Sequence, residues 1–285
     1  MNISFSQQVK NDLCALPLKK KCCRRSFLYG CMYVTRNFKR DNIEFGADTP
    51  PIASCLRALL SGVFGVSCAE DSKITISLPS DLDLVFNELG EGAAASLDCG
   101  VFVCEGCRQS FLRGAFIECG TVNAPGRACH FEFAVADEKT ATELAALLNE
   151  LGFSPGVTVR SSFVGVYFKG SEAVEDILNL IGAQRAAFAL MDAKIVRELR
   201  NEANRRVNCD TANISKTVDA AQNHIEAIER VLTSGAADLP PALLITARLR
   251  IDNPDATLAE LAALHDPPLT KSGVKHRLDR LVKML

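Results

Sequence analysis

The segments "CRRSFLYGCMYVTR" (residues 23–36) and "CRQSFLRGAFIECG" (residues 107–120) are two copies of one pattern. Aligned without a gap, they share Cys, Arg, Ser, Phe, Leu and Gly at matching positions, from Cys23 and Cys107 to Gly30 and Gly114. The apolar residues of both copies recur at helical spacing. The same helix is therefore predicted twice in this chain, which indicates an internal duplication.

The segments that follow the two copies also correspond. After the first copy come the alternating "NIEFGA", the helical "PIASCLRALLSGVFG", the alternating "KITISLP" and the helical "LDLVFNELG". After the second come "CHFEFAV", "KTATELAALLNELGF", "GVTVRS", "FVGVYFKG" and "SEAVEDILNLIGA". The recurring order predicts helix, strand, helix, strand, strand, helix. A unit of about 85 residues is too long for a solenoid repeat, so the pattern predicts an α+β domain of two halves related by a pseudo-twofold axis.

Gly30 and Gly114 indicate how the repeated helices meet. Glycine inside a helix costs about 1 kcal/mol relative to alanine, so its presence needs a reason. Close approach of two helix backbones is the usual one. We therefore predict that residues 22–35 pack against residues 106–119 at the pseudo-dyad.

The rest of the chain reads as helical. The pattern of residues 183–232 predicts one helix or two, with a break near Asn208 to Thr211. The segment "SGAAD" that follows is typical of a linker. From Leu239 onward three short helices are expected, the second opened by the capping-box pair Thr257 and Glu260. We predict a duplicated domain over 1–182, a helical bridge and linker over 183–238, and an all-α helix-turn-helix domain over 239–285.

The last helix is the candidate DNA-binding element. Val274, Leu278 and Leu281 form its apolar stripe, which leaves a polar, basic face outward. Recognition helices enter the major groove with their N-terminal residues closest to the bases. We predict base contacts from Ser272, Lys275 and His276, and phosphate contacts from Thr270, Lys271, Arg277 and Arg280. Residues 239–285 carry only seven basic against five acidic residues, so a helical docking module without DNA binding remains the alternative.

The net charge of -2 conceals an uneven distribution. Residues 1–40 carry nine basic residues against one acidic, whereas residues 41–105 carry two basic against eleven acidic. The basic arm is either a solvated approach to the first helix or a nucleic-acid contact, because charge alone specifies no partner. No apolar run is long enough to span a membrane and the start lacks signal-peptide order, so we expect a cytoplasmic protein with no membrane partner.

Twelve cysteines are scattered through apolar segments. Reduced, buried thiols are the expected state in such a chain, so no metal and no cofactor are predicted. Cys22, Cys23, Cys104 and Cys107 are the exception, because they open the two repeats and could bind zinc if the repeats lie side by side. Adjacent cysteines are poor paired ligands, so this question stays open at the level of sequence.

"FLRGAFIECG" resembles the signature helix of the LAGLIDADG homing endonucleases, whose paired helices each deliver an acidic residue to a metal-dependent DNA-cleavage site. Here Cys119 and Thr35 stand where that acid is expected. Neither can replace a carboxylate ligand of a hard divalent ion. Glu118, the nearest acid, is expected to be exposed or capping. We predict no enzymatic activity and no small-molecule substrate; a residual metal-dependent nuclease is the alternative.

The degenerate repeat, the bridge "ELRNEANRRVNCDTANISKTVDAAQ" and the C-terminal segment "LPPALLITARLRIDNPDATLAELAALHDPPLTKSGVKHRLDRL" together resemble the WhiA family of bacterial regulators. The resemblance implies a nucleoid-associated regulator of double-stranded DNA linked to cell division, chromosome segregation and, in spore formers, sporulation. It also implies recognition by the C-terminal domain and a catalytically dead endonuclease-like domain. A second transcriptional regulator or RNA polymerase is a candidate partner. A protein-interaction scaffold in cell division is the alternative.

Overall fold

The computed structural model describes residues 3–69, 73–97, 99–233 and 239–284. The chain divides into two compact units, residues 1–197 and residues 198–285. The boundary lies within one helix, α8 (Gln184–Thr233). The predicted linker at residues 234–238 lies outside the described residues.

The first half of the N-terminal unit carries a three-stranded antiparallel sheet of order β1-β2-β3. Ile43 pairs with Phe38 on one side and with Ile76 on the other. Its elements in chain order are α1 (Phe5–Ala15), α2 (Lys21–Tyr33), β1 (Asn37–Phe38), β2 (Ile43–Gly46), α3 (Pro50–Phe64), β3 (Lys73–Ile76) and α4 (Pro79–Leu89). A short 3-10 turn at Cys99–Val101 leads into the second half.

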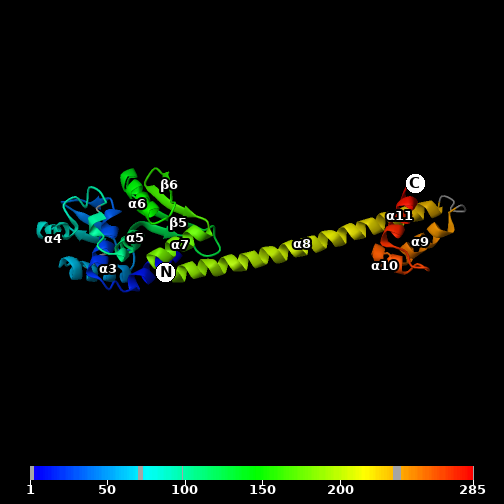
Figure 1. Cartoon of the computed structure of the whole chain (residues 1–285), viewed down its shortest axis with the longest axis horizontal. Coiled ribbons are helices and arrows are strands. Elements are labelled where there is room, and N and C mark those ends of the chain that lie inside the picture. Colours follow the sequence, from blue (N-terminus) through cyan, green and yellow to red (C-terminus); the bar gives the residue numbers. More distant parts are fainter. Residues whose placement is uncertain (1–2, 70–72, 98, 234–238, 285) are drawn as a thin grey trace. The chain divides into compact units, whose positions relative to one another are not determined.

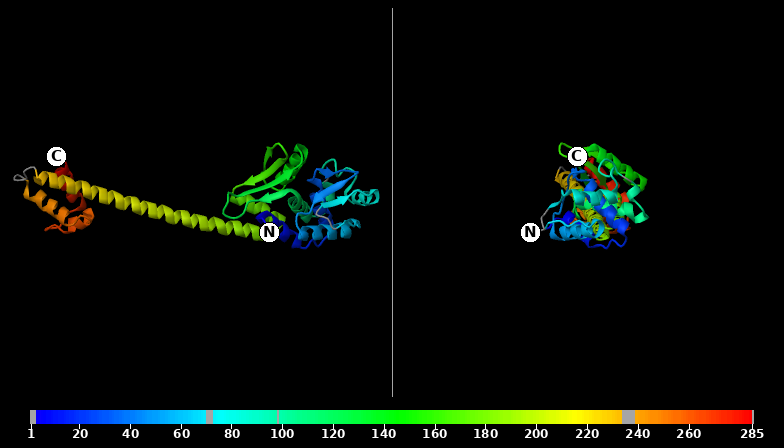
Figure 2. Two further views of the ribbon diagram at one scale, coloured as in Figure 1. Left: turned by 180° about the vertical axis from the view of Figure 1, so that it is seen from behind. Right: turned by 90° about the vertical axis from the view of Figure 1, so that its left-hand side faces the viewer.

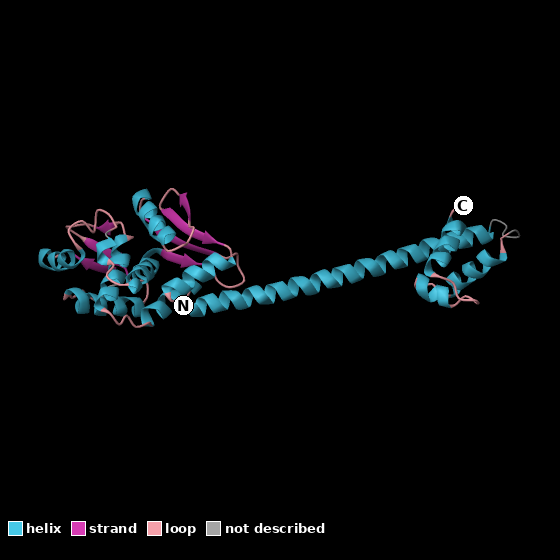
Figure 3. Ribbon diagram, in the orientation of Figure 1, coloured by secondary structure: helices cyan, strands magenta, loops and turns pink. Residues whose placement is uncertain are grey.

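The second half carries a four-stranded antiparallel sheet of order β4-β5-β7-β6. Phe131 in its central strand pairs with Val122 and with Phe168. Its elements are α5 (Glu105–Cys119), β4 (Gly120–Val122), β5 (His130–Val135), α6 (Glu138–Glu150), β6 (Gly156–Val159), β7 (Val164–Lys169) and α7 (Ser171–Ile181). Figure 3 shows the two sheets in magenta, and Figure 2 shows the blue first half beside the green second half from behind.

The two halves confirm the predicted α+β fold with internal pseudo-twofold symmetry. In each half a repeated helix is followed by a short strand, a longer strand, a helix, a further strand and a final helix. The described part of the first half has one strand after α3, whereas the second half has two after α6. β1 and β4 were not expected, because segments of two and three residues are too short to show alternation.

The repeated helices α2 and α5 pack against each other at the centre of the unit. A Cβ placed on Gly30 would overlap the carbonyl group of Phe111, and one placed on Gly114 would overlap that of Phe27. The two overlaps are reciprocal, as a pseudo-dyad requires. Phe27 and Phe111 are themselves buried in one continuous core that includes both halves. Backbone contact between the helices therefore joins the halves directly.

α1 fastens the second sheet at its edge. The Ser4 side chain accepts from the backbone N–H of Gln7 and the Gln7 side chain accepts from that of Ser4, a capping box that starts the helix. In the same first turn, the Ser6 hydroxyl accepts from the N–H of Val122 and donates to its carbonyl, both at 2.9 Å. This exchange occupies backbone groups of the edge strand β4 that would otherwise be free to pair with another chain.

α8 is one continuous helix, so the predicted break near Asn208 to Thr211 is wrong. The segment contains neither glycine nor proline. Asn, Asp and Thr each cost less than about 0.7 kcal/mol in a helix, which is too little to interrupt one. Ala187 and Leu190 near its start belong to the core of the N-terminal unit, and Ile228 near its end belongs to the core of the other.

The C-terminal unit completes a small helical core with α9 (Pro241–Asp252), α10 (Leu258–Ala263) and α11 (Lys271–Val282). α9 ends at Asp252, with Asn253 as its C-terminal cap, and α10 begins, as predicted, with the capping box of Thr257 and Glu260. The core consists of Ile228, Leu243, Ala247, Leu261, Ala262, Val274, Leu278 and Leu281. No helix among the described residues is long and apolar enough to cross a membrane.

Candidate nucleic-acid interface

α11, the last helix of the chain (Figure 1), begins at the cap residue Thr270. The Thr270 side chain accepts a hydrogen bond from the backbone N–H of Gly273 at 3.1 Å. This occupies one of the N–H groups at the helix start that lack an intrahelical partner. Thr270 therefore fixes where the helix begins, and the remaining N–H groups keep the partial positive charge that favours an anion.

The burial of α11 separates its two faces as the spacing predicts. Val274, Leu278 and Leu281 are buried, with at most 1% of each exposed. Five exposed residues of α11 can donate hydrogen bonds: Lys271 at the helix start, and Ser272, Lys275, His276 and Arg280 on the faces away from the stripe. Asp279 is half-buried and is the acidic residue of this helix. A polar, mainly basic face is thus presented on a helix that the core holds in place.

Arg277 is directed toward the interior of the module. Its Nη1 atom donates to the carbonyl of Ala242 at 3.2 Å and to the hydroxyl of Thr246 at 3.4 Å. The Thr246 hydroxyl also lies 2.9 Å from Nε2 of the buried His265. Arg277 therefore ties α11 to α9, and its half-buried guanidinium is less free than the other predicted phosphate contacts.

Arg250 is a second arginine with a structural role, which no pattern in the sequence indicates. Only 2% of the residue is exposed. Its Nη1 donates to the carbonyls of Pro254 and Ala256 at 3.2 Å and 2.8 Å, and more weakly to that of Asn253. The guanidinium thus holds the turn between α9 and α10, because a buried charge needs such hydrogen bonds.

Thr35 and Cys119, at the acid positions of the LAGLIDADG pattern, line a cleft of about 420 Å³ at the C-terminal ends of α2 and α5. Thr35 donates its hydroxyl to the carbonyl of Glu44 at 2.8 Å, and the Cys119 thiol contacts the carbonyl of Ala115 at 3.3 Å. Both side chains are therefore engaged with backbone. The cleft also includes Glu44 and Glu118.

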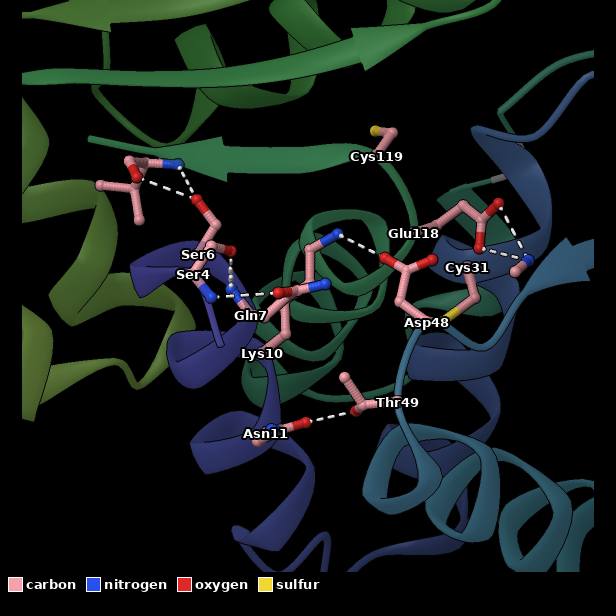
Figure 4. A network of polar contacts seen from close by, with 12 residues as sticks. Ser4, Ser6, Gln7, Lys10, Asn11, Cys31, Asp48, Thr49, Glu118 and Cys119 are labelled. Carbon is pink, nitrogen blue, oxygen red and sulfur yellow. Dashed lines mark hydrogen bonds and ion pairs between the residues drawn. The ribbon is translucent and has the colours of Figure 1, made fainter. Parts of the chain in front are cut away.

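Glu118 is neither exposed nor capping, contrary to expectation. It is half-buried, and both of its carboxylate oxygens accept from the backbone N–H of Gly46, at 3.0 Å and 3.2 Å (Figure 4). Burial raises the pKa of the Glu118 carboxyl to about 7, against the lowering effects of the Gly46 hydrogen bond and the Lys10 charge. Lys10 is itself buried and lies 3.8 Å from Asp48. The end of β2 in the first half thus binds the Glu118 carboxylate and holds it partly away from solvent.

The cleft does not assemble a metal site from the residues described. Within those residues, the group of three or more metal-ligating side chains that lies close enough to share an ion is Cys22, Cys23, Cys104 and Cys107. These cysteines stand at the starts of α2 and α5, at the opposite ends of the paired helices from Thr35 and Cys119. The structure thus brings together the four thiols whose approach the sequence left open.

Comparisons with known proteins cover nearly the whole chain. A family model described as the WhiA LAGLIDADG-like domain matches residues 108–200, and one described as the WhiA C-terminal HTH domain matches residues 203–285. The probable cell division protein WhiA of Heliobacterium modesticaldum is 33% identical over 98% of this chain and 95% of its own length. The protein of the same description from Clostridium botulinum strain Hall is 33% identical over 99% and 98%.

A solved structure agrees with the fold. The crystal structure of full-length DUF199/WhiA from Thermotoga maritima matches with a TM-score of 0.60 and 23% identity, covering 99% of this chain and 98% of that one. At this identity the match supports the fold alone. Together with the two domain matches and the relatives at 33% identity, it shows that this chain belongs to the WhiA family.

Proposed function

We propose that this chain is a transcriptional regulator that binds specific sites on double-stranded DNA through α11. Its proposed roles are cell division, chromosome segregation and, in spore-forming bacteria, sporulation. The observation that carries the proposal is a set of exposed donors on a helix fixed by three buried apolar residues: Lys271 at the start of α11, and Ser272, Lys275, His276 and Arg280 on its outer face. This is the arrangement by which a recognition helix presents donors to base edges and phosphates.

We assign separate tasks along α11. Ser272, Lys275 and His276, in its N-terminal half, are proposed to contact bases. Lys271 and Arg280, with the helix start at Thr270, are proposed to contact phosphate. Arg277 is proposed to act mainly by holding α11 on α9, since its guanidinium already donates to Ala242 and Thr246.

The N-terminal unit is proposed to have lost the cleavage reaction. A hydroxyl and a thiol occupy the two acid positions, and both contact backbone carbonyls. Glu118 is displaced from the metal position and accepts from Gly46. Supercoiled plasmid incubated with the pure protein and magnesium or manganese should stay intact, and nicking that follows the protein through purification would contradict this part of the proposal.

The protein is proposed to act in the cytoplasm on the nucleoid, with a second transcriptional regulator or RNA polymerase as a further partner. The first test is a duplex-binding titration at increasing salt. Binding that neutralises phosphates releases counterions, so affinity should fall steeply between about 50 and 200 mM salt. Failure to retain any duplex at low salt would instead favour the protein-interaction scaffold.

A further inference from the structure

Four cysteine sulfurs converge where the paired helices begin. Cys22 and Cys23 lie in the first turn of α2, Cys104 is the residue that caps the start of α5, and Cys107 lies in the first turn of α5. All four sulfur atoms lie within 4.8 Å of one another, and none forms a disulfide. Cysteines 81 to 85 positions apart in the chain thus meet only because the repeats pack across the pseudo-dyad.

The spacing of the sulfurs fits one tetrahedral ion. The Cys104 sulfur lies 3.7 Å from that of Cys22, 3.5 Å from that of Cys23 and 3.6 Å from that of Cys107. Zinc–sulfur bonds of about 2.3 Å in a regular tetrahedron place the sulfurs about 3.8 Å apart. An iron–sulfur cluster distributes its ligands over two or more metal ions and needs a wider separation. The geometry is therefore that of a mononuclear site.

Adjacent cysteines are unfavourable paired ligands in mid-helix, because consecutive side chains diverge by about 100°. Here the cysteines lie at the ends of the helices, which lets adjacent side chains reach one point despite this divergence. Cys22 and Cys23 stand at the open end of α2, and Cys104 stands at the open end of α5, so sulfurs from both helices reach the same point. The hydrogen bond from the Cys107 N–H to the Cys104 carbonyl, at 2.9 Å, closes the turn that brings those two sulfurs together.

We propose that Cys22, Cys23, Cys104 and Cys107 bind one Zn²⁺ ion that joins the two halves of the N-terminal unit. The four sulfurs leave no open coordination position, and Cys23 and Cys107 are buried. A closed, four-thiolate zinc site is structural. Cys22 and Cys104 are half-buried, which leaves the ion a path from solvent.

The surroundings suit the negative charge of a zinc tetrathiolate. The starts of both α2 and α5 point their partial positive charge at the sulfurs. The chain around Cys22 and Cys23 is basic, with Lys20 and Lys21 before them and Arg24 after them. The negative charge of the zinc tetrathiolate would thus be balanced in part by the basic residues of "KKKCCRR". One of them, Lys21, also pairs with Glu88 at 2.8 Å.

One buried hydroxyl is available to support a ligating sulfur. Ser26, one helical turn after Cys22 and Cys23 in α2, is buried, and its hydroxyl makes no hydrogen bond to another described residue. Outer-shell hydroxyls of this kind commonly support the ligands of metal sites. The equivalent Ser110 of α5 instead donates to the carbonyl of Gly106 at 2.8 Å.

The test is the metal content of the full chain, purified under reducing conditions without chelator. Elemental mass spectrometry should find about one zinc per chain. Cys104→Ser/Cys107→Ser should lose the zinc, whereas Cys68→Ser/Cys209→Ser, which changes two cysteines outside the cluster, should retain it. Removing zinc with a chelator should lower the melting temperature of the wild type and of that control, because metal binding contributes to folding stability.

A second measurement keeps the test decisive if the ligand variant does not fold. Metal-free wild-type protein reloaded with Co²⁺ should take up about one equivalent and show the intense visible and near-ultraviolet absorption of a tetrahedral thiolate centre. The proposal is overturned if the reduced chain holds no zinc and takes up neither Zn²⁺ nor Co²⁺. Bound iron in place of zinc, or a native disulfide between Cys104 and Cys107, would overturn it equally.

Discussion

At Gly30 and Gly114 the backbones of α2 and α5 approach so closely that even a methyl group overlaps the facing carbonyl. Each glycine faces the phenylalanine of the other copy, Phe111 or Phe27. Glycine's usual cost in a helix is therefore offset by contact between the two halves. The repeated pattern made these two residues visible in the sequence.

Gly114→Ala should lower the free energy of unfolding of the N-terminal unit by about 1 to 3 kcal/mol, because the helices must separate. Gly62→Ala is the matched control: it also lies inside a helix, α3, but its added methyl meets nothing within 4 Å. That change should raise stability by about 0.5 to 1 kcal/mol. Urea unfolding followed by tyrosine fluorescence reports this unit alone, since Tyr29, Tyr33 and Tyr167 all lie in it. Equal midpoints for the two variants would contradict the dyad packing.

Glu118 should make stability depend on pH. Burial raises its pKa in the folded state to about 7 from an ordinary value of 4.5, so the folded protein holds the proton more tightly than the unfolded chain. The stability that this proton provides is complete below about pH 4.5 and is lost as pH rises through 7, at a cost of about 1 to 3 kcal/mol.

Glu118→Gln should remove this loss and raise the melting temperature at pH 8 more than at pH 5. Glu44→Gln changes a half-buried carboxylate of the same cleft, whose pKa the Lys73 hydrogen bond lowers, so the fall between pH 5 and 8 should persist in it. Identical pH profiles for wild type and Glu118→Gln would show that the carboxylate is ionised throughout.

Other residues of the site could not be read from the sequence. Arg250 and Arg277 look like surface charges, yet their guanidiniums donate to backbone carbonyls within the helical module. Glu118 was expected to be exposed because nothing near it in the helix indicates that β2 packs beside it. The N–H that Glu118 binds belongs to Gly46 in that strand. In each case the partner is distant in sequence or set by a turn, and a helical period alone does not locate it.

Among the elements, periodicity located the helices from α2 onward and the strands of four or more residues, but no helix was predicted over α1. The duplication placed the elements that follow each repeated helix in two halves. Periodicity did not find β1 and β4, whose pairing depends on neighbouring strands. It placed a break in α8 because Asn and Asp favour turns, but those preferences are weak beside an uninterrupted helical segment. The end of α8 also belongs to the core of the C-terminal unit through Ile228, which composition did not indicate.

Ile228→Ala should therefore destabilise the C-terminal unit by about 2 to 4 kcal/mol, because it removes buried methyl groups from a small core. Ile214→Ala on the same helix is the control, since Ile214 is 65% exposed. Its effect should stay within about 0.5 kcal/mol. Hydrogen exchange of the amides of α9, α10 and α11 measures this unit separately, and unchanged exchange in Ile228→Ala would show that α8 is dispensable to it.

In the molecule as a whole, the chain combines an endonuclease-like domain without its two acids with a helix-turn-helix domain whose α11 is proposed to contact DNA. The family could be recognised from the sequence because both domains and the bridge occur in one order. The role of each residue on α11 could be predicted only from helix geometry, which separates the buried stripe from the outer face. That outer face carries the central claim, that α11 lies in the major groove.

The most direct test of that claim compares Lys275→Ala and Arg280→Ala on a cognate and a scrambled duplex across a salt series. Lys275→Ala should lose about 1 to 3 kcal/mol on the cognate site and relax the preference at one base pair, as removal of a base contact does. Arg280→Ala should weaken both duplexes alike and reduce the salt slope by about one. Lys169→Ala, an exposed lysine of the N-terminal unit outside the basic arm, is the control and should bind as the wild type does. If Lys275→Ala and Arg280→Ala both leave affinity and salt slope unchanged on either duplex, α11 does not enter the groove and the account is contradicted.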